Sequence, residues 1–558
     1  MAPHLLNFQP TTPSLSLGSL KWPNTLLHIP LVAPTNALRK FHFRCIASSR
    51  TNVDSTIARR SANYQPSIWH HDFVQSLNSK YTGEIYIKRG EKLKENVRRM
   101  LEKTSGSSSS LNLIDTIQRL GLNYHFDTEI KGALDTIMSI KDKNVCEVKD
   151  LYTRALRFRL LRQHGYEVSQ DIFKSFTEEM KSGDLKPSMV KDVKGLLSLY
   201  EASFYAFEGE EILDEVQEFT SRHLIKALQG NNSIISPNLS KQVSHALELP
   251  LHWRVPRIEA RWFINTYQMM QDMDPLLLQF AKLDFNIVQA AHQEDLKYVS
   301  RWWTELNFIE ELSFARDRLV ESFFTSVGIN FEPEFGNCRR EITKLNSLVN
   351  TIDDIYDVYG SLDELKLFTA AVERWDIKML EELPHYMKIC FLALYNTTNE
   401  MAYHILRRHG RDTLPYLKKV VLRYTFILIS LGNEISKEAS ECLKNNNPDL
   451  LRWSSMIVRL ADDLGTSTDE LARGDVAKSI QCYMHQTGVS ESIAREHIKH
   501  LISDTWKKMN KDQTAGVLNS HDHLSVRQKM LLGQVNVCTS MEMGLVFQTG
   551  RPKIGLCH

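Results

Sequence analysis

One stretch, Thr351–Tyr359, constrains the fold most strongly, because it places three aspartates inside an apolar pattern of helical spacing. Apolar residues recur there at intervals of three and four: Leu345, Leu348, Val349, Ile352, Ile355, Tyr356 and Tyr359. This spacing predicts a helix on which Asp353 and Asp357 are one turn apart on one face, with Asp354 about 100° away. Carboxylates four residues apart repel each other, and a divalent cation removes that repulsion. The stretch is therefore either a metal motif or a solvated acidic patch.

A second acidic cluster follows Arg459 further along the chain. Its helical pattern places Asp462, Thr466 and Glu470 at intervals of four, so that their oxygen atoms line one face. Hard oxygen ligands suit Mg²⁺, which is usually held by one or two carboxylates together with substrate phosphates. Alone, this cluster could also be an acidic helix start. Two such clusters on separate helices indicate metal clamps on either side of one anionic ligand.

Together these motifs resemble the aspartate-rich motif and the second metal motif of class I terpene synthases. Arg59–Arg60, followed by eight residues and then Trp69, is similar to the plant monoterpene branch of that family. Ala315–Arg318 stands where the family has arginines that contact diphosphate, and Leu196–Ala202 is also typical. The resemblance extends over about 59–512 and implies a monoterpene synthase.

The fold class implied is all-α, with two helical domains. Helical apolar patterns recur along the chain, and glycine is scarce, with 24 residues. The resemblance divides the chain into an N-terminal α-barrel-like domain over 56–255, a catalytic domain over 256–515 and an atypical tail over 516–558. The helices expected in the first domain include Ser110–Gly121, Glu147–His164, Val193–Phe207 and Glu210–Gln229. This half contains no Asp-x-Asp-Asp sequence, which a protonation-initiated cyclase would use, so its predicted role is structural.

Composition narrows the class of partners. The chain has 558 residues, enough for more than one domain, and a formal net charge of +1, which gives no indication of a nucleic-acid partner. Its eight cysteines show no zinc or disulfide spacing, so they are expected to be reduced thiols. No apolar run approaches the ~18 residues of a membrane span. We expect a soluble monomer.

The N-terminal leader, 1–55, has the composition of an organelle transit peptide. The first acidic residue is Asp54, and ten Ser or Thr residues and several basic residues precede it. The resemblance implies a plastid (chloroplast) stroma, with cleavage between about Cys45 and Arg59. A disordered N-terminus is the alternative.

The resemblance also assigns the site. Five residues would hold Mg²⁺, with three ions expected per active site and Mn²⁺ as the alternative ion: Asp353, Asp357, Asp462, Thr466 and Glu470. Six basic residues would serve catalysis by binding the diphosphate or capping the site: Arg59, Arg60, Arg316, Arg318, Arg459 and Lys478. The substrate implied is geranyl diphosphate, bound through Arg316, Asp353, Asp357, Arg459 and Asp462. Thr325 replaces a tryptophan that commonly lines the family's pocket, beside Phe323 and Phe324, and this favours acyclic products.

Two further departures from the family pattern concern length and tail. Asp353 and Asp462 are 109 positions apart (462 minus 353), whereas the family interval is longer by roughly thirty residues, about two helices. The join falls after Leu414–Lys419, and Val420–Leu431 then resumes a later helix. From about Gly516 the sequence does not resemble the family's closing helices.

The sequence therefore predicts a Mg²⁺-dependent monoterpene synthase that releases diphosphate and makes an ocimene, linalool, terpineol or thujene type of product. Two alternatives remain open. The shortened domain and unusual tail favour a catalytically impaired or inactive helical paralogue. A chain-elongating prenyl transferase would need a second aspartate-rich motif, and Thr466 stands where its third aspartate belongs.

Overall fold

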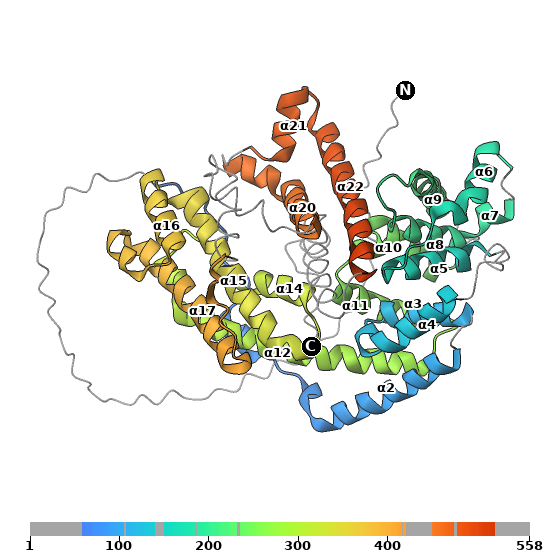
Figure 1. Ribbon diagram of the computed structural model, residues 1–558, viewed down its shortest axis with the longest axis horizontal. Helices are drawn as coiled ribbons and strands as arrows, with labels where there is room; N and C mark the ends of the chain where they lie inside the picture. The colour runs from blue at the N-terminus through green and yellow to red at the C-terminus, as the bar shows by residue number, and fades with distance from the viewer. Residues whose placement is uncertain are drawn as a thin grey trace, which may run out of the picture. The chain divides into compact units, whose positions relative to one another are not determined.

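The computed structural model describes 59–104, 108–139, 150–184, 187–230, 235–415, 417–419, 449–473 and 477–518. These residues belong to the second of two units, Ala58–His558. The described residues form helices and their connections without a strand, which confirms the all-α prediction (Figure 1). The predicted transit peptide, the Val420–Leu431 helix and the tail beyond Leu518 lie outside the described residues.

The first half contains short and long helices in succession. They are α1 (His71–Ser76), η1 (Lys80–Thr82), α2 (Glu84–Thr104), α3 (Ser108–Arg119), η2 (Asn123–His125), α4 (Asp127–Ser139), α5 (Leu151–Gln163), η4 (Gln170–Phe173), α6 (Lys174–Ser182), α7 (Pro187–Lys191), α8 (Val193–Ser203), α9 (Glu211–Gln229) and α10 (Pro237–Glu248). The four helices named from the sequence are α3, α5, α8 and α9, so those predictions are confirmed within a few residues at each end.

The second half contains the longest helices. They are η5 (Leu251–Trp253), α11 (Pro256–Tyr267), α12 (Pro275–Leu306), α13 (Phe308–Glu311), α14 (Leu319–Ile329), η6 (Pro333–Phe335), α15 (Gly336–Asp354), the π-helical turn η7 (Ile355–Tyr359), α16 (Leu362–Arg374), η8 (Ile377–Glu382), α17 (His385–His409), α20 (Asp449–Arg473), α21 (Ser479–Thr487) and α22 (Glu491–Leu518). Helix α2 packs along α12 (Figure 1).

Side-chain caps fix where several helices begin. Asp192 accepts a hydrogen bond from the backbone N–H of Gly195 at the start of α8. Asp274 accepts two, from Leu276 and Leu277, at the start of α12, where Pro275 occupies the first turn. Each such cap stabilises its helix by about 1 kcal/mol. Proline suits the first turn because a backbone N–H at that position would have no partner within the helix. The local sequence thus sets the starts of α8 and α12.

Four hydrophobic clusters make up the described core. Two lie mainly among the N-terminal helices, and one of these includes α11 and the first half of α12, through Phe263, Leu277 and Leu283. The third gathers α12 to α17, and the fourth joins α20–α22 to Leu249 and Trp253. The boundary at 255 remains a prediction, because α11 and the start of α12 pack with the helices before them.

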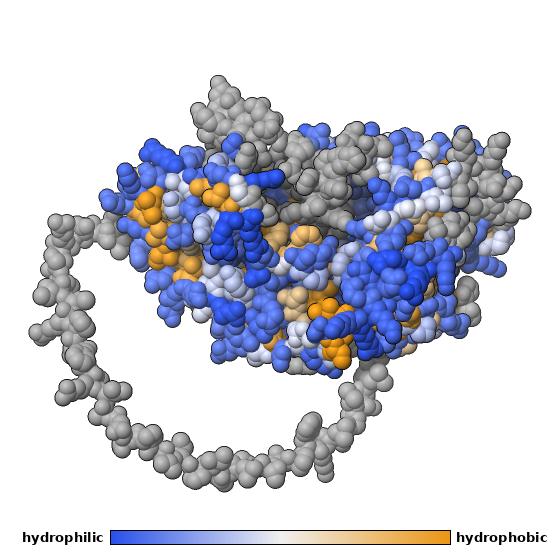
Figure 2. Space-filling model, turned by 60° about the horizontal axis from the view of Figure 1, so that its bottom comes forward, coloured by the Kyte–Doolittle hydropathy of each residue, from blue (hydrophilic) through white to orange (hydrophobic). Residues whose placement is uncertain are grey.

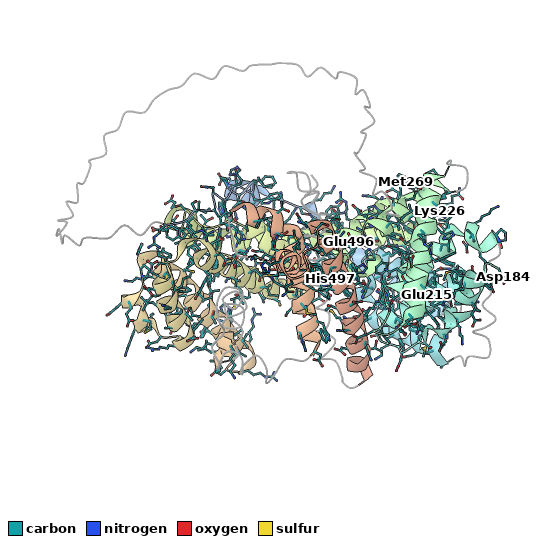
Figure 3. All side chains as sticks on the ribbon, turned by 90° about the horizontal axis from the view of Figure 1, so that it is seen from above. Asp184, Glu215, Lys226, Met269, Glu496 and His497 are labelled. Carbon is teal, nitrogen blue, oxygen red and sulfur yellow. The ribbon has the colours of Figure 1, made fainter. Side chains whose placement is uncertain are left out.

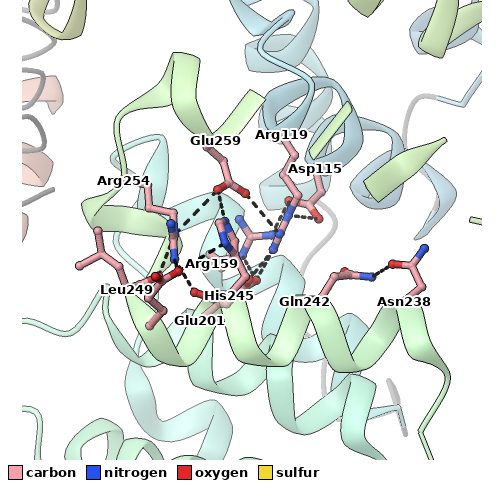
Figure 4. A network of polar contacts seen from close by, with 11 residues as sticks. Asp115, Arg119, Arg159, Glu201, Asn238, Gln242, His245, Leu249, Arg254 and Glu259 are labelled. Atoms are coloured by element: carbon pink, nitrogen blue, oxygen red, sulfur yellow. Dashed lines mark hydrogen bonds and ion pairs between the residues drawn. The ribbon is translucent and has the colours of Figure 1, made fainter. Parts of the chain in front are cut away.

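A buried network of ion pairs ties the N-terminal helices together (Figure 4). Arg159 Nη2 lies 2.5 Å from Asp115 Oδ1, and Arg119 Nη2 lies 2.6 Å from Glu201 Oε1. Glu259 joins the same network through Arg119, whose Nη1 lies 4.0 Å from Glu259 Oε1, and His245 Nε2 lies 2.7 Å from Glu259 Oε2. Removing one partner of a buried pair costs about 3–5 kcal/mol, because the other charge is left uncompensated. Glu201 belongs to the family-typical stretch Leu196–Ala202, so the structure gives that stretch a role in packing.

Among the described helices, none combines the length and apolar character that crossing a membrane requires. Figure 2 shows a mostly hydrophilic face with several patches of apolar side chains. Exposed apolar side chains occur on separate elements, for example Ile85 on α2, Met269 after α11 and Tyr403 on α17. Isolated apolar side chains on a surface are ordinary.

Candidate metal and diphosphate site

The first aspartate motif spans the end of α15 and the π-helical turn η7. The predicted helix is present, but the sequence did not predict that Ile355–Tyr359 would form a π turn, closed by a 2.8 Å hydrogen bond from Gly360 N to the Ile355 carbonyl. Single π turns inside helices are rare and are frequent at functional sites. Ile352, Ile355 and Val358 are buried, whereas Asp357 is exposed. The buried side chains therefore leave Asp357 at the surface of the core.

Arg316 neutralises this motif directly. Its backbone N–H donates to Asp354 Oδ2 at 2.7 Å, its Nε lies 2.8 Å from Asp354 Oδ1, and its Nη2 donates to Asp353 Oδ2 at 2.5 Å. Burial acts to lower the pKa of Arg316, but the two carboxylates raise it above its ordinary value. An arginine from the segment before α14 therefore offsets the negative charge of Asp353 and Asp354. Relief of the repulsion between Asp353 and Asp357 by a metal remains a prediction.

The N-terminal segment 59–69 crosses the same motif. Arg59 forms a bidentate pair with Glu364, with nitrogen–oxygen distances of 2.8 and 2.9 Å, and donates to the Tyr359 carbonyl at 3.1 Å. Its guanidinium lies over the rings of Tyr359 and Tyr386, at 4.6 and 5.0 Å from their centroids. The hydrogen bonds from Arg59 lower the pKa of Glu364 to about 2. A planar guanidinium suits both the forked carboxylate contact and aromatic stacking.

Further contacts extend this segment across the motif. Arg60 Nη1 donates to the Asp357 carbonyl at 3.3 Å, and the Arg316 guanidinium lies 5.2 Å from the Tyr64 ring centroid. Arg318 donates to the Gln65 carbonyl at 3.4 Å. Trp69 packs against the third hydrophobic cluster. The basic residues predicted to cap the site therefore lie beside the first metal motif.

The second motif lies on α20. Arg459 places Nη2 at 2.5 Å from Asp463 Oδ1 and Nη1 at 3.6 Å from Asp462 Oδ2. Thr466 Oγ1 donates to the backbone carbonyl of Asp462 at 2.9 Å, four residues earlier. Glu470 is on the same helix, and its side chain lies outside the described residues. The prediction that Asp462, Thr466 and Glu470 share one helix is confirmed, and their role as metal ligands remains a prediction.

Helix α21 follows the second motif and contacts it. Lys478 stands immediately before α21, and its backbone N–H donates to Gln481 Oε1 at 3.1 Å. The next residue, Ser479, donates its backbone N–H to Asp463 Oδ2 at 2.9 Å. The predicted basic residue Lys478 is therefore held near the second motif by a backbone contact of its neighbour.

The predicted site residues fall into two groups. In the first group Arg316 contacts Asp353, Arg60 contacts the Asp357 carbonyl, Arg59 contacts the Tyr359 carbonyl, and Arg318 contacts Gln65 of the N-terminal segment. In the second group Arg459 and Thr466 contact Asp462, and Lys478 precedes Ser479, which contacts Asp463. The meeting of these groups across one diphosphate remains a prediction.

The donor set suits Mg²⁺. In the part of the chain that the structure describes, no three acidic, histidine or cysteine side chains are close enough to bind a metal by themselves. Mg²⁺ needs only one or two carboxylates when substrate phosphates and water complete its coordination. Asp353 Oδ1 accepts no hydrogen bond from the described residues, since the contact with Arg316 uses Oδ2. Asp353 is therefore able to provide one hard oxygen ligand.

Several residues near the motifs escaped the sequence analysis. Asp354 and Asp463, the second aspartate of each pair, are buried against arginines. Phe314 stacks on Tyr359 with ring centroids 3.8 Å apart, and Tyr386 meets Tyr359 edge-on. The signal available for the aspartates was their adjacency, since two neighbours on a helix cannot both face the same ligand. No comparable signal links Phe314 or Tyr386 to the motif.

The predicted pocket walls are partly core residues. Phe323 is buried in the third hydrophobic cluster, and Thr325 Oγ1 donates to the Glu321 carbonyl at 3.2 Å. The hydroxyl at the position of the family's tryptophan is thus bonded to its own helix. A Thr hydroxyl that bonds back to the helix presents less polarity to its surroundings.

A cavity of about 630 Å³ lies in the first half of the chain, between α7, α8, α9 and α10. Lys191, His223 and Lys226 line it together with apolar side chains and Ser240. Figure 3 shows Lys226 and Glu215 on α9, and Glu496 and His497 on α22. The described residues of this lining include no carboxylate, and neither predicted metal motif contributes to it.

Comparison with known proteins defines the class. The family model described as "Terpene synthase, N-terminal domain" matches 68–247, and "Terpene synthase family, metal binding domain" matches 304–426 and 420–508. The chain belongs to the terpene synthase family. Within it, the chain falls in the angiosperm monoterpene synthase branch, as a metal-dependent lyase.

The relatives support this placement. A chloroplastic myrcene synthase of Quercus ilex is 50% identical over 520 residues, covering 87% of this chain and 86% of the relative. A (-)-alpha-terpineol synthase of Vitis vinifera is 48% identical, covering 88% and 89%. The comparisons support neither an inactive paralogue nor a prenyl transferase.

Two solved structures share the fold. Limonene synthase with 2-fluorolinalyl diphosphate is 38% identical, with a TM-score of 0.79, covering 87% of this chain and 95% of that one. Isoprene synthase from grey poplar, in complex with three Mg²⁺ ions and dimethylallyl-S-thiolodiphosphate, is 40% identical, with a TM-score of 0.71, covering 84% and 94%. The metal-binding match is divided in two near 420–426, where the sequence analysis placed the join.

Proposed function

We propose that this monoterpene synthase acts on geranyl diphosphate through two metal motifs that share one diphosphate, under a cap formed by 59–69. The observation that supports this most is the contact of Arg316 with both Asp353 and Asp354 beneath Tyr64. The arginine and the carboxylates needed for a metal diphosphate complex are side by side there.

The metal would be held by Asp353 and Asp357 on one side and by Asp462, Thr466 and Glu470 on the other. Bound Mg²⁺ would stabilise the negative charge that develops on the leaving diphosphate. Arg316, Arg459 and Lys478 would donate hydrogen bonds to phosphate oxygens, and Arg is suited to this because its planar fork grips two oxygens at once.

The cap would exclude water from the allylic cation. The pair of Arg59 with Glu364 holds the N-terminal segment to α16, and Arg60 holds it to the motif itself. Excluding water favours loss of a proton, which gives a hydrocarbon, over capture of water, which gives an alcohol.

The shortened interval between the motifs should leave the pocket open on one side. Helices packed around such a pocket bury apolar stripes on their neighbours, so the absence of two leaves part of the wall missing. We expect a large alcohol fraction or very low activity. Inserting the missing helices from a relative should raise activity and the hydrocarbon fraction together.

We further propose that the enzyme is a monomer of the plastid stroma, with 1–55 as its transit peptide, since relatives such as the myrcene and alpha-thujene synthases are named chloroplastic. The domain limits at 255 and 515 belong to the same proposal.

The function is tested by product analysis. Purified enzyme with geranyl diphosphate and Mg²⁺ should release diphosphate and yield a ten-carbon alcohol or hydrocarbon. Addition of isopentenyl diphosphate should leave the products at ten carbons. Longer products would identify a prenyl transferase, and no release from folded protein would identify an inactive paralogue.

A further inference from the structure

Each metal motif pairs an exposed aspartate with a buried one. The side chain of Asp353 is 23% exposed and that of Asp354 is 0% exposed. In the second motif the values are 41% for Asp462 and 3% for Asp463. Adjacent residues on a helix point about 100° apart, so one can meet solvent while the other meets the core. The two motifs therefore share an arrangement although they lie on different helices.

Both buried aspartates use their oxygens on protein groups. Asp354 meets Arg316 through Nε at 2.8 Å and through the backbone N–H at 2.7 Å. Asp463 meets Arg459 Nη2 at 2.5 Å and accepts the Ser479 backbone N–H at 2.9 Å. In each case Oδ1 lies within ion-pair distance of an arginine without hydrogen-bond geometry, and Oδ2 accepts a backbone N–H; Tyr64 also hydrogen-bonds to Asp354. A fully buried carboxylate engaged in this way cannot reach a hydrated Mg²⁺.

The contacts of Arg316 leave one of its terminal nitrogens for another ligand, whereas both terminal nitrogens of Arg459 face carboxylates of its own motif. Asp354 and Asp353 engage Nε and Nη2 of Arg316, and among the described contacts Nη1 has no hydrogen-bond acceptor. Arg459 is held most closely through Nη2, with Nη1 3.6 Å from Asp462. An arginine side chain that is already fixed loses less rotamer entropy when it binds a ligand than a free one does.

We propose that Asp354 and Asp463 are positioning residues, each of which orients the arginine of its own motif toward the substrate diphosphate and does not bind metal. This inference rests on the proposed function, because it takes Arg316 and Arg459 as diphosphate donors. It assigns separate tasks to the two aspartates of each pair: Asp353 and Asp462 bind metal, and Asp354 and Asp463 prepare an arginine.

The alternative is that Asp354 and Asp463 only stabilise the fold, and the experiment must distinguish this from a positioning role. The chain offers a matched control in the pair of Asp295 and Arg339, which joins α12 to α15. Asp295 Oδ2 accepts from Arg339 Nε at 3.0 Å and from Nη2 at 2.8 Å, and both side chains are buried. This pair resembles the other two in burial and chemistry but contacts neither metal motif in the contacts described above.

The experiment uses the full chain with Asp354→Asn, Asp463→Asn and Asp295→Asn. Binding of inorganic diphosphate at saturating Mg²⁺ is measured by calorimetry, and binding of Mn²⁺ without diphosphate by electron paramagnetic resonance. Both motif variants should weaken diphosphate binding at least tenfold while changing Mn²⁺ affinity less than twofold. Asp295→Asn should lower the thermal midpoint and leave diphosphate affinity within twofold.

Three results would overturn the inference: loss of Mn²⁺ affinity in either motif variant, unchanged diphosphate affinity in both, or equal weakening in Asp295→Asn. Absence of diphosphate binding by the unaltered enzyme would instead contradict the proposed function, and the inference with it.

A second comparison covers the case in which Asp354→Asn does not fold, since a buried arginine would be left uncompensated. The double variant Arg316→Gln/Asp354→Asn removes both charges and is compared with Arg316→Gln alone. If Asp354 acts through Arg316, the two should bind diphosphate within threefold of each other. A much weaker double variant would show that Asp354 has a separate role and would overturn the inference.

Discussion

The two metal motifs are supported by different parts of the molecule. The first motif, on α15 and η7, belongs to a hydrophobic cluster drawn from α12 to α17, with Val74 as an added member. The second, on α20, belongs to a smaller cluster of α20–α22 side chains together with Leu249 and Trp253, which follow α10. Both motifs pack mainly with helices near them in the chain, but the second also packs with two residues some two hundred positions earlier, Leu249 and Trp253.

The second motif is supported by a specific interface between α22 and residues that precede α11. Trp506 of α22 stacks on Trp253 with ring centroids 5.7 Å apart, and Asn510 donates to the carbonyls of Phe204 and Ala206 at 3.0 and 3.1 Å. Asn510 Oδ1 then accepts a hydrogen bond from His252 Nε2 at 2.8 Å, since the amide nitrogen is already donating. The N-terminal helices thus help to place the second metal motif, in addition to their own packing.

The largest expected effect comes from removing a metal ligand in the first region. Asp353→Ala should lower turnover by at least about 10²–10³-fold, because charge on the leaving group is no longer neutralised. Its stability should change by about 1 kcal/mol or less, because the pair with Arg316 is partly exposed. Asp363→Ala, at an exposed aspartate on α16, serves as the control and should keep full turnover. Unfolding of Asp353→Ala would show the cluster to be structural.

The next largest effect is expected from a substitution that weakens only the cluster supporting the second motif. Trp506→Ala should destabilise the α20–α22 cluster by about 3–5 kcal/mol, because a fully buried indole leaves a cavity. Hydrogen exchange should then rise in α20 and α22 while α15 stays protected. Phe391→Ala, at a buried site in the third hydrophobic cluster, which supports the first motif, should give the opposite pattern. Equal loss of protection in both regions would show that they unfold as one unit.

The cap should have a moderate effect on product. Glu364→Gln removes the charged acceptor of Arg59, so the alcohol fraction of the product should rise while stability falls by about 1 kcal/mol or less. Deletion through Trp69 should act in the same direction, and deletion ending at Thr56 should leave the product unchanged. Gas chromatography of the terpene mixture measures all three. Identical mixtures from both truncations would remove the capping role.

The smallest expected effect is on the pH dependence of stability, to which one buried histidine in each region contributes. Burial lowers the pKa of His252 to about 4 and that of His292 to about 3. The unfolded chain therefore binds a proton between each value and about 6.5 that the folded chain does not, so stability falls as pH is lowered through that window, by about 1.4 kcal/mol per pH unit for each histidine. His252→Gln should flatten this dependence for exchange in α22, and His292→Gln should leave it unchanged there. A flat profile in the unaltered enzyme would contradict the burial of both.

Much of the fold and the motif positions could be predicted because they depend on local pattern. Apolar spacing indicated α3, α5, α8 and α9, and the separation of Asp462 from Thr466 placed both on one helix. The nearness of Arg59 and Arg60 to the first motif came from the family resemblance, since nothing in the segment's own composition requires it.

The rest depends on contacts between distant residues, which a single sequence does not encode in a readable way. The π turn at Ile355–Tyr359 reflects packing around α15, because the same residues fit an ordinary helix by spacing alone. The contact of Arg316 with Asp354 joins segments 38 positions apart, and that of Asn510 with Phe204 joins segments 306 apart. Such pairs have no common periodicity, so they appear only once the helices are placed.

The central claim is that both motifs act on one diphosphate, and a double-mutant cycle tests it most directly. Diphosphate binding at saturating Mg²⁺ is measured by calorimetry for the unaltered enzyme, Asp353→Ala, Asp462→Ala and the double variant. A shared diphosphate predicts that each single change weakens binding strongly and that the double variant is no more than severalfold weaker than the worse single one, a clear departure from additivity. Strictly additive losses, or unchanged binding in Asp462→Ala, would contradict the account.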